Sequence, residues 1–174
     1  MVILTERLRI IPVSRALAVA ELQDRIAFAS LLDAEVPADW PPDSLADALL
    51  FFLGLMAEHP DWLGWLGWYA IACDKPTPTL IGSIGFKGPP RGDGEVEIGY
   101  SVLPKYRRFG YATEMARGLV HWARSVGGVQ TVIAQTTDDN LGSHRLLLKL
   151  GFVPSGQGED AGSTLYRLVF AERA

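Results

Sequence analysis

Residues 95–126 decide the fold, and they read EVEIGYSVLPKYRRFGYATEMARGLVHWARSV. The first eight residues alternate between two kinds of side chain, as in a half-buried β-strand. The apolar face carries Val96, Ile98, Tyr100 and Val102, and the other face carries Glu95, Glu97, Gly99 and Ser101. From Gly110 onward apolar residues recur at helical spacing, at Ala112, Met115, Ala116, Leu119, Ala123 and Val126. The stretch therefore predicts a strand, a loop that contains two arginines, and a helix.

The rest of the chain predicts a mixture of strands and helices. Strands are expected at 2–11, 66–72, 80–86, 129–136, 152–156 and 163–170, and helices at 14–32, 44–58 and 143–150. Antiparallel strands come first and a strand-helix-strand unit follows, so we expect an α/β architecture with a mixed sheet. No repeat and no long linker divides the chain, and a single domain over 1–174 is expected.

The composition is typical of a soluble globular protein and disfavours a nucleic-acid partner. Apolar residues make up 48% of the chain and charged residues 21%, with a net charge of −4 and a pI of about 5.3. A broad basic surface for DNA or RNA is therefore not expected. Lys105, Arg107 and Arg108 nevertheless form one local basic cluster.

The cysteine and histidine pattern predicts neither a disulfide nor a metal site. Cys73 is the single cysteine of the sequence, which excludes an internal disulfide and makes a cysteine-based zinc site implausible. The histidines, His59, His121 and His144, show no metal-ligand spacing. We therefore expect a protein that binds no metal.

The apolar segments predict no membrane partner. The most apolar run, residues 45–57, is too short to cross a bilayer and contains Asp47. The N-terminal segment carries Glu6, Arg7 and Arg9 where a secretory signal would be apolar. A cytoplasmic location is the expectation that follows.

The loop before the helix at 110–126 has the composition of an anion site. The first turn of a helix presents backbone N–H groups without internal partners, and the helix dipole adds to their attraction for anions. Gly110 removes a side chain where a ligand would touch the backbone, Ala112 keeps the next position small, and Arg107 and Arg108 add positive charge. The same pattern is also compatible with a simple turn glycine beside solvated arginines, and taken alone it leaves both interpretations open.

Several motifs in order resemble one enzyme family. TERLRI at 5–10, EIGY at 97–100, GYATE at 110–114 and TDDNLGSHRLLLKLGF at 137–152 are similar to the GNAT superfamily of acetyl-CoA-dependent N-acetyltransferases, and within it to the ribosomal-protein N-terminal acetyltransferases. The resemblance covers residues 1–13 and 80–153. Residues 14–79 match no motif of the family, and this segment would select the acceptor.

The resemblance implies a fold and a cosubstrate. The fold would be a central, mostly antiparallel sheet with splayed central strands, flanked by helices, and the cosubstrate would be acetyl-CoA. The pantetheine arm would fill the gap between the strands at 95–102 and 129–136, with its amide held by Asn140. The pyrophosphate would be wrapped by the loop that contains Arg107, Arg108, Phe109, Gly110, Ala112 and Thr113.

The chemistry requires a group that takes a proton from the amine, because an amine is protonated at neutral pH. Glu97 is the first candidate base and Glu95 the second, although glutamates on a strand are also commonly just solvated. Many members of the family place a tyrosine proton donor where this chain has Leu147. Ser143 matches the ribosomal-protein branch and could donate to the sulfur instead, whereas Asn140 and Ser143 could also serve helix capping.

Three functions are compatible with these residues. The resemblance favours an N-acetyltransferase that acts on a primary amine, most simply the α-amine of a protein or peptide. A second possibility is a small-molecule amine such as an amino acid, a polyamine or an aminoglycoside. The third is a coenzyme A-binding module with little catalysis, which the departure at Leu147 permits.

Residues 33–68 combine acids with aromatic residues. The tryptophans are Trp40, Trp62, Trp65 and Trp68, and the acids are Asp33, Glu35, Asp39, Asp43 and Asp61. If this segment overhangs the cleft, the acids and rings would attract a cationic amine. The competing interpretation places the tryptophans in the core or in a homodimer contact.

Overall fold

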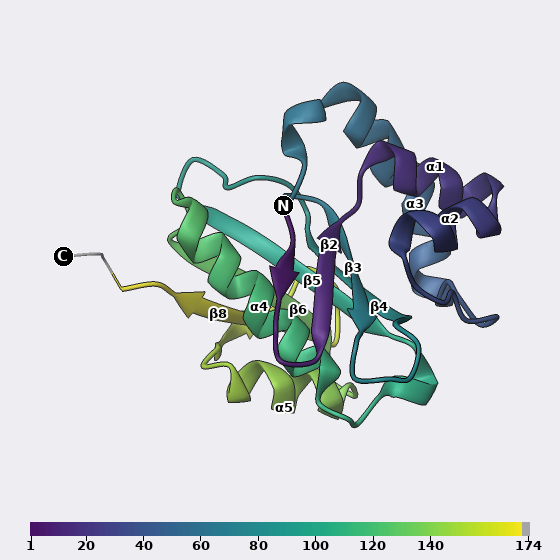
Figure 1. Cartoon of the computed structure of the whole chain (residues 1–174). Helices are drawn as coiled ribbons and strands as arrows, with labels where there is room; N and C mark the ends of the chain where they lie inside the picture. Colours follow the sequence, from purple (N-terminus) through teal and green to yellow (C-terminus); the bar gives the residue numbers. More distant parts are fainter. Residues whose placement is uncertain (172–174) are drawn as a thin grey trace.

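The computed structural model describes residues 1–171, apart from the side chains of residues 43–48. Eight strands form a sheet in the order β1-β2-β3-β4-β5-β6-β8-β7 (Figure 1). Their bounds are β1 Ile3–Leu4, β2 Leu8–Pro12, β3 Gly67–Ala72, β4 Thr79–Phe86, β5 Glu95–Val102, β6 Thr131–Thr137, β7 Val153–Gln157 and β8 Ser163–Val169. Neighbouring described strands run antiparallel except β5 and β6, which are parallel. The expected mixed α/β sheet is confirmed.

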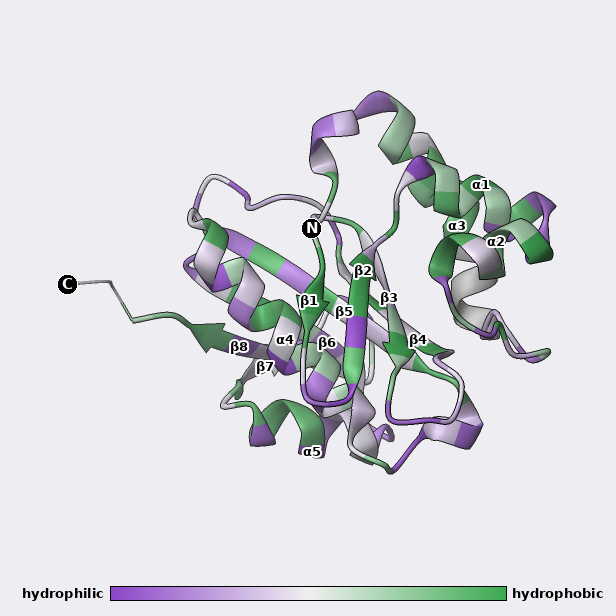
Figure 2. Cartoon of the chain, viewed as in Figure 1, coloured by the Kyte–Doolittle hydropathy of each residue, from purple (hydrophilic) through white to green (hydrophobic). Residues whose placement is uncertain are grey.

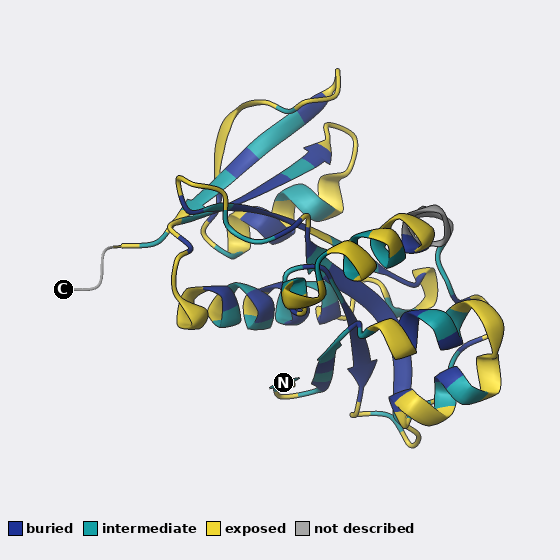
Figure 3. Ribbon diagram, turned by 90° about the horizontal axis from the view of Figure 1, so that it is seen from above, coloured by how far each residue is buried: buried dark blue, intermediate teal, exposed yellow. Residues whose placement is uncertain are grey.

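Helices cover both faces of this sheet. They are α1 Arg15–Gln23, α2 Arg25–Leu32, α3 Asp43–Glu58, α4 Tyr111–Val126 and α5 Leu141–Lys149, with short 3-10 turns at Pro60–Trp62 and Pro104–Tyr106. Figure 3, seen from above, shows the buried strands between two groups of helices whose outer sides are exposed. No described helix combines the length and the apolar character that a membrane crossing needs.

Each face of the sheet carries its own apolar core. On one side Trp68 and Phe86 pack with Met115 and Leu119 of α4. On the other side Tyr69, Ile71 and Leu80 pack with residues of α1 and α2 such as Leu17, Phe28 and Leu32. Consecutive residues of a strand point to opposite faces, so Trp68 and Tyr69 belong to different cores and β3 is buried on both sides. Hydrophilic and hydrophobic bands alternate along α4 and β5, as the periodicities predict (Figure 2).

Strand β5 passes from one neighbour to the other along its length. Its first three residues pair with β6, ending at Glu97 opposite Ile133. Its last five residues, Ile98 to Val102, pair with β4. Beyond Glu97 the strands β5 and β6 therefore part, and the gap between them opens toward the start of α4.

Two predicted elements are wrong in their extent. The strand expected at 2–11 is broken by a turn, in which the backbone N–H of Thr5 donates to the carbonyl of Leu8 at 2.9 Å, and it becomes β1 and β2. The helix expected at 14–32 is broken at Asp24. The Asp24 carboxylate accepts hydrogen bonds from the N–H groups of Ile26 and Ala27, both at 3.0 Å, and so starts α2 anew.

Glu114 fastens the turn between β1 and β2 to the first turn of α4. Its carboxylate accepts hydrogen bonds from the Thr5 hydroxyl at 2.6 Å and from the Arg7 backbone N–H at 2.8 Å. The Arg7 guanidinium pairs with the same carboxylate at 2.7 Å and donates to the Phe109 carbonyl at 3.0 Å. Arg7 therefore joins the N-terminal turn, α4 and the loop that precedes α4.

We expect Glu114→Gln to lower the free energy of unfolding by about 2 kcal/mol at pH 7, since charge-assisted hydrogen bonds are lost at a side chain only 16% exposed. Burial raises the pKa of Glu114, but the hydrogen bonds from Thr5 and Arg7 lower it more, so the net pKa is lowered. A lowered pKa in the folded state stabilises the protein above the ordinary glutamate pKa, about 4.3. Urea titrations at several pH values should show the difference between the two proteins shrinking below that value. A difference that does not change down to pH 3 would contradict the assignment.

Candidate functional site

A cavity of about 610 Å³ lies between the second half of β5, the start of α4 and α5. Of the residues expected to bind the cosubstrate, seven line it: Arg107, Arg108, Gly110, Ala112, Thr113, Asn140 and Ser143. Phe109, expected in the same loop, is 61% exposed and does not line the cavity. The structure thus brings together residues that are more than thirty positions apart in the sequence.

The backbone of the loop presents N–H groups to this cavity. Arg108 and Gly110 have positive φ angles of 68° and 84°, a left-handed conformation that is costly for arginine and easy for glycine. When left-handed residues alternate with residues of ordinary backbone conformation, successive N–H groups turn toward one concave side, and this favours the binding of anions. Gly110 is the N-cap of α4 and provides no side-chain hydrogen bond, so the first N–H groups of the helix remain available to a ligand.

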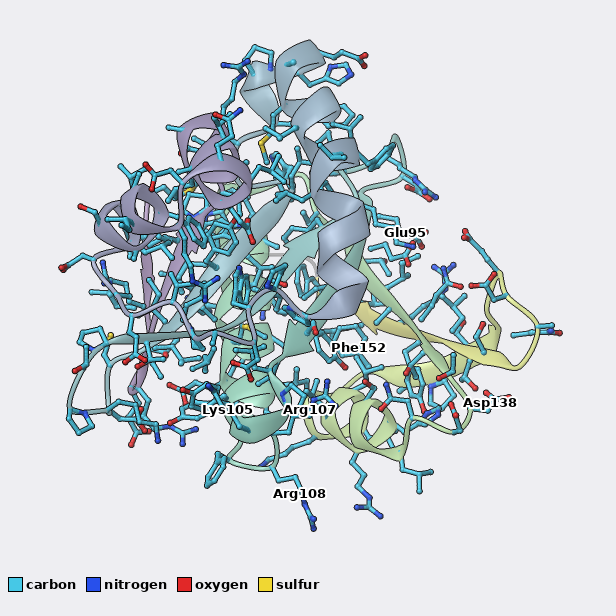
Figure 4. All side chains as sticks on the ribbon, turned by 90° about the vertical axis from the view of Figure 1, so that its right-hand side faces the viewer. Glu95, Lys105, Arg107, Arg108, Asp138 and Phe152 are labelled. Atoms are coloured by element: carbon cyan, nitrogen blue, oxygen red, sulfur yellow. The ribbon has the colours of Figure 1, made fainter. Side chains whose placement is uncertain are left out.

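Four cationic side chains line the cavity, and two of them were missed from the sequence. Besides Arg107 and Arg108, these are Arg145 and Lys149 of α5, and no described acidic residue lines this cavity. Arg107 also donates to the Val102 carbonyl at 2.9 Å and so fixes the loop to the end of β5. In Figure 4 the Arg108 side chain extends outward from the loop. Spacing i, i+4 on a helix places Arg145 and Lys149 on one face, a signal that the sequence did offer.

A second cavity, of about 240 Å³, is lined by β3, β4, β5 and α3, and by Glu21 of α1. Tyr100 and Ser101 of β5 line both cavities, so the two spaces adjoin at the strand that separates them. The lining is largely apolar, with side chains such as Phe52, Met56 and Val13. A ligand in one cavity would therefore lie close to a ligand in the other only near Tyr100 and Ser101.

Tyr100 is a candidate proton donor, although the sequence pattern assigned it only to the apolar face of a strand. Burial raises the pKa of its phenol, and an interaction with the Ser143 hydroxyl lowers it by less. Leu147, at the position where the family's tyrosine was expected, is buried in the core and only 1% exposed. Tyr100 and Ser143 are thus two hydroxyl groups close together on the wall of the larger cavity.

The two candidate bases lie where β5 pairs with β6. Glu97 is 8% exposed, with its carboxylate 2.5 Å from the Lys87 ammonium and 3.2 Å from the Gln135 amide nitrogen. It stands where the strands part, two residues before Gly99, which lines the smaller cavity. Glu95 pairs with Arg167 at 2.6 Å and lies far from Arg107 and Arg108 (Figure 4). Neither carboxylate lines either of the two cavities described above.

Among the described side chains of residues 33–68, the tryptophans and acids do not form a joint site. Trp40 and Trp68 are buried and Trp65 packs against Trp122 with ring centroids 4.9 Å apart, which confirms the core interpretation for these three. Asp33, Glu35, Asp39 and Asp61 are exposed, and none of them lines either cavity. The Asp43 side chain lies outside the described residues. Within the described chain, no three His, Cys, Asp or Glu side chains are grouped to hold a metal ion.

Comparisons with known proteins agree on one family. Residues 7–153 match the acetyltransferase (GNAT) domain model. An uncharacterized N-acetyltransferase of Bacillus subtilis (strain 168), YjdG, is 34% identical over 150 residues, 86% of this chain and 88% of that protein. Among solved structures, a ribosomal-protein-S5-alanine acetyltransferase from Vibrio fischeri has a TM-score of 0.63 at 18% identity, covering 97% of this chain and 96% of that one. A ribosomal L7/L12 α-N-protein acetyltransferase in complex with coenzyme A has a TM-score of 0.65 at 16% identity, covering 97% and 98%.

We expect Asn140→Ala to destabilise the protein by about 1 kcal/mol, because the Asn140 side chain caps α5 by accepting a hydrogen bond from the Ser143 N–H at 3.1 Å. Asn140→Asp keeps a capping oxygen and serves as the matched control, with little expected loss. Urea denaturation of both variants measures the difference. Equal stability of Asn140→Ala and the parent protein would show that the cap contributes nothing.

Proposed function

The chain belongs to the GNAT acetyltransferase family, and on that basis we propose that it acetylates the α-amine of a protein or peptide. The observation that carries the proposal is the pair of cavities that adjoin at Tyr100 and Ser101, next to the gap between β5 and β6. One cavity is lined by cations and backbone N–H groups, and the other is largely apolar. The first suits the phosphates of acetyl-CoA and the second suits the acceptor.

The larger cavity fits acetyl-CoA in its charges and its backbone. Acetyl-CoA, when bound, supplies an acetyl group activated as a thioester. The N–H groups at the start of α4, near Gly110, Ala112 and Thr113, would bind its pyrophosphate, with positive charge from Arg107, Arg108, Arg145 and Lys149. In the described residues the pairing of β5 with β6 ends at Glu97, so the backbone of Ile98 to Ser101 on the β6 side would be available to hydrogen-bond to the pantetheine arm, and Asn140 lines the same cavity.

We assign to Glu97 the role of the base that accepts a proton from the attacking amine. Its position at the point where the strands part places it beside Gly99 and the smaller cavity. Its pairing with Lys87 fixes the carboxylate, and a water molecule between Glu97 and the amine would complete the path for the proton. Glu95 remains the second candidate, although its ion pair with Arg167 holds it farther along the strand.

Tyr100 and Ser143 are the groups we assign to the sulfur side of the reaction. The phenol of Tyr100 is protonated at neutral pH, as its pKa is raised further by burial, and it can donate a hydrogen bond to the sulfur. Ser143 is next to it and is the residue expected from the sequence. Together they offer a proton source that does not depend on a tyrosine at position 147.

The choice of a peptide acceptor rests on the ribosomal-protein acetyltransferases with the same fold. A small-molecule amine is the alternative, supported by the modest volume of the smaller cavity, about 240 Å³. Incubation of the protein with acetyl-CoA and a panel of peptides and small amines, followed by mass spectrometry, decides between them. Absence of any acetylated product would favour the third possibility, a coenzyme A-binding module with little catalysis.

We expect Ala112→Leu to weaken acetyl-CoA binding at least about tenfold, because the larger side chain enters the cavity from a residue with ordinary helical backbone. Gly110→Val should also abolish tight binding, but its positive φ adds backbone strain that could disturb the fold. Calorimetry measures the affinity, with His121→Leu, exposed on the same helix, as the control. Unchanged affinity in a folded Ala112→Leu protein would contradict the assignment of this cavity.

We expect Glu97→Gln to slow acetyl transfer at neutral pH. The loss of rate should be smaller at high pH, because free amine is then abundant without a base. Glu95→Gln is the matched control on the same strand and should have a smaller effect. Rates under conditions where chemistry limits turnover, measured from pH 6 to 10, give the profile. A parallel loss at every pH would assign Glu97 a structural role in place of the proton transfer.

A further inference from the structure

The floor of the smaller cavity is a stretch of sheet from which side chains are missing. In the strand register Gly67 of β3 lies opposite Gly85 of β4, which lies opposite Gly99 of β5. Directly opposed residues share one face of a sheet, and all three glycines line the cavity. A Cβ at Gly99 would meet no atom within 4 Å, whereas one at Gly67 would contact the Val13 side chain at 3.2 Å and one at Gly85 would clash with the backbone of Leu66 and Gly67, so the floor is open at its Gly99 end. The cavity is therefore a slot between a glycine row and the side chains of Leu49, Phe52 and Met56 on α3.

A row of polar residues crosses the floor next to the glycines. Two residues along each strand, Tyr69, Ser83 and Ser101 are opposed in the same way and also line the cavity. Ser101 adjoins the larger cavity, whereas Tyr69 is two strands away, a distance of about 10 Å at the usual strand spacing. The slot thus extends from the proposed reaction centre toward the hydroxyl of Tyr69.

Glu21 stands at the Tyr69 end of the slot. It lies one helical turn after the buried Leu17, so it occupies the core-facing side of α1. Its carboxylate accepts hydrogen bonds from the Trp40 indole N–H at 2.6 Å and from the Tyr69 hydroxyl. These two donors fix the carboxylate on the wall of the cavity, which it lines.

The Glu21 carboxylate is held by neutral groups. In the described part of the chain no lysine or arginine pairs with it: Lys87, the cation of the cavity wall, is paired with Glu97, and Arg25 is bound to the carbonyls of Val36 and Pro37. Burial raises the pKa of Glu21. The hydrogen bonds from Tyr69 and Trp40 lower it by less, so the net pKa is raised. A carboxylate withdrawn from water is costly without a cation, and a cationic ligand would remove that cost.

We propose that Glu21 is a specificity-determining residue that binds a second positive charge of the acceptor, one carried on an apolar stem apart from the reacting amine. The proposal rests on the function proposed above: the reacting amine lies at the end of the slot near Gly99 and Ser101, and the apolar stem lies between the glycine row and α3. The cationic head then reaches Glu21. For a peptide acceptor, this geometry selects a basic first residue, whose α-amine is acetylated while its side chain occupies the slot.

The test compares two short peptides that differ only in the first residue, arginine or its neutral isostere citrulline. Binding is measured by calorimetry with the full chain, so no turnover is required. The arginine peptide should bind at least about tenfold more tightly, and Glu21→Gln should remove that preference while leaving coenzyme A affinity unchanged. Glu58→Gln, on the exposed end of α3, is the control and should keep the preference.

A second variant tests the location of the site without touching the carboxylate. Gly99→Val fills the open floor of the slot. It should weaken the binding of both peptides and preserve the preference for the arginine peptide. Equal binding of the two peptides to the parent protein, or a preference that survives in Glu21→Gln, would overturn the proposal. Full affinity of Gly99→Val for both peptides would overturn it as well. A preference for arginine without acetylation of either peptide would instead count against the proposed function and leave the binding role of Glu21 standing.

Discussion

The structure depends on the way strand β5 divides its hydrogen bonds between two neighbours. Residues Glu95 to Glu97 pair with β6, and residues Ile98 to Val102 pair with β4. The pairing with β6 joins the two parts of the sheet, and it ends at Glu97, whose carbonyl still accepts a hydrogen bond from the Lys87 N–H on the other edge. The gap between β5 and β6 and the position of Glu97 beside it follow from the end of this pairing, and the two cavities adjoin at Tyr100 and Ser101 beyond it.

The two faces of β5 also separate two kinds of electrostatic environment. The larger cavity is lined by four cations and the start of α4, whereas the smaller one is lined by Glu21 and by Lys87, whose ammonium is paired with Glu97. Under the proposed function, an anionic cosubstrate and a cationic acceptor would be attracted to opposite sides of one strand. Their reacting groups would meet where the strand carries small or hydroxyl side chains, at Gly99, Tyr100 and Ser101.

The sequence predicts elements whose periodicity is local and fails where tertiary contacts decide. The strand at 95–102 and the helix that follows Gly110 were predicted nearly to the residue, because alternation and helical spacing are properties of consecutive residues. The breaks at Thr5 and Asp24 come from hydrogen bonds that single side chains and turns make. The motifs pointed to the loop at 107–113, most of whose residues line the larger cavity, and its role in binding the cosubstrate stays a prediction. The sequence did not point to Glu21, because its contacts depend on the fold and on Trp40 and Tyr69, which no linear pattern connects to it.

The division of the molecule into two apolar cores has a consequence for how such a protein can change its acceptor over evolutionary time. The larger cavity adjoins the core shared by α4 and the sheet, and the helical wall of the slot belongs to the core of α1, α2 and α3. Substitutions in Leu49, Phe52 or Met56 would reshape the slot without entering the packing of α4 against the sheet. If the slot binds the acceptor as proposed, a lineage can change its amine through the helical layer alone, while the residues proposed to bind the acetyl donor are kept.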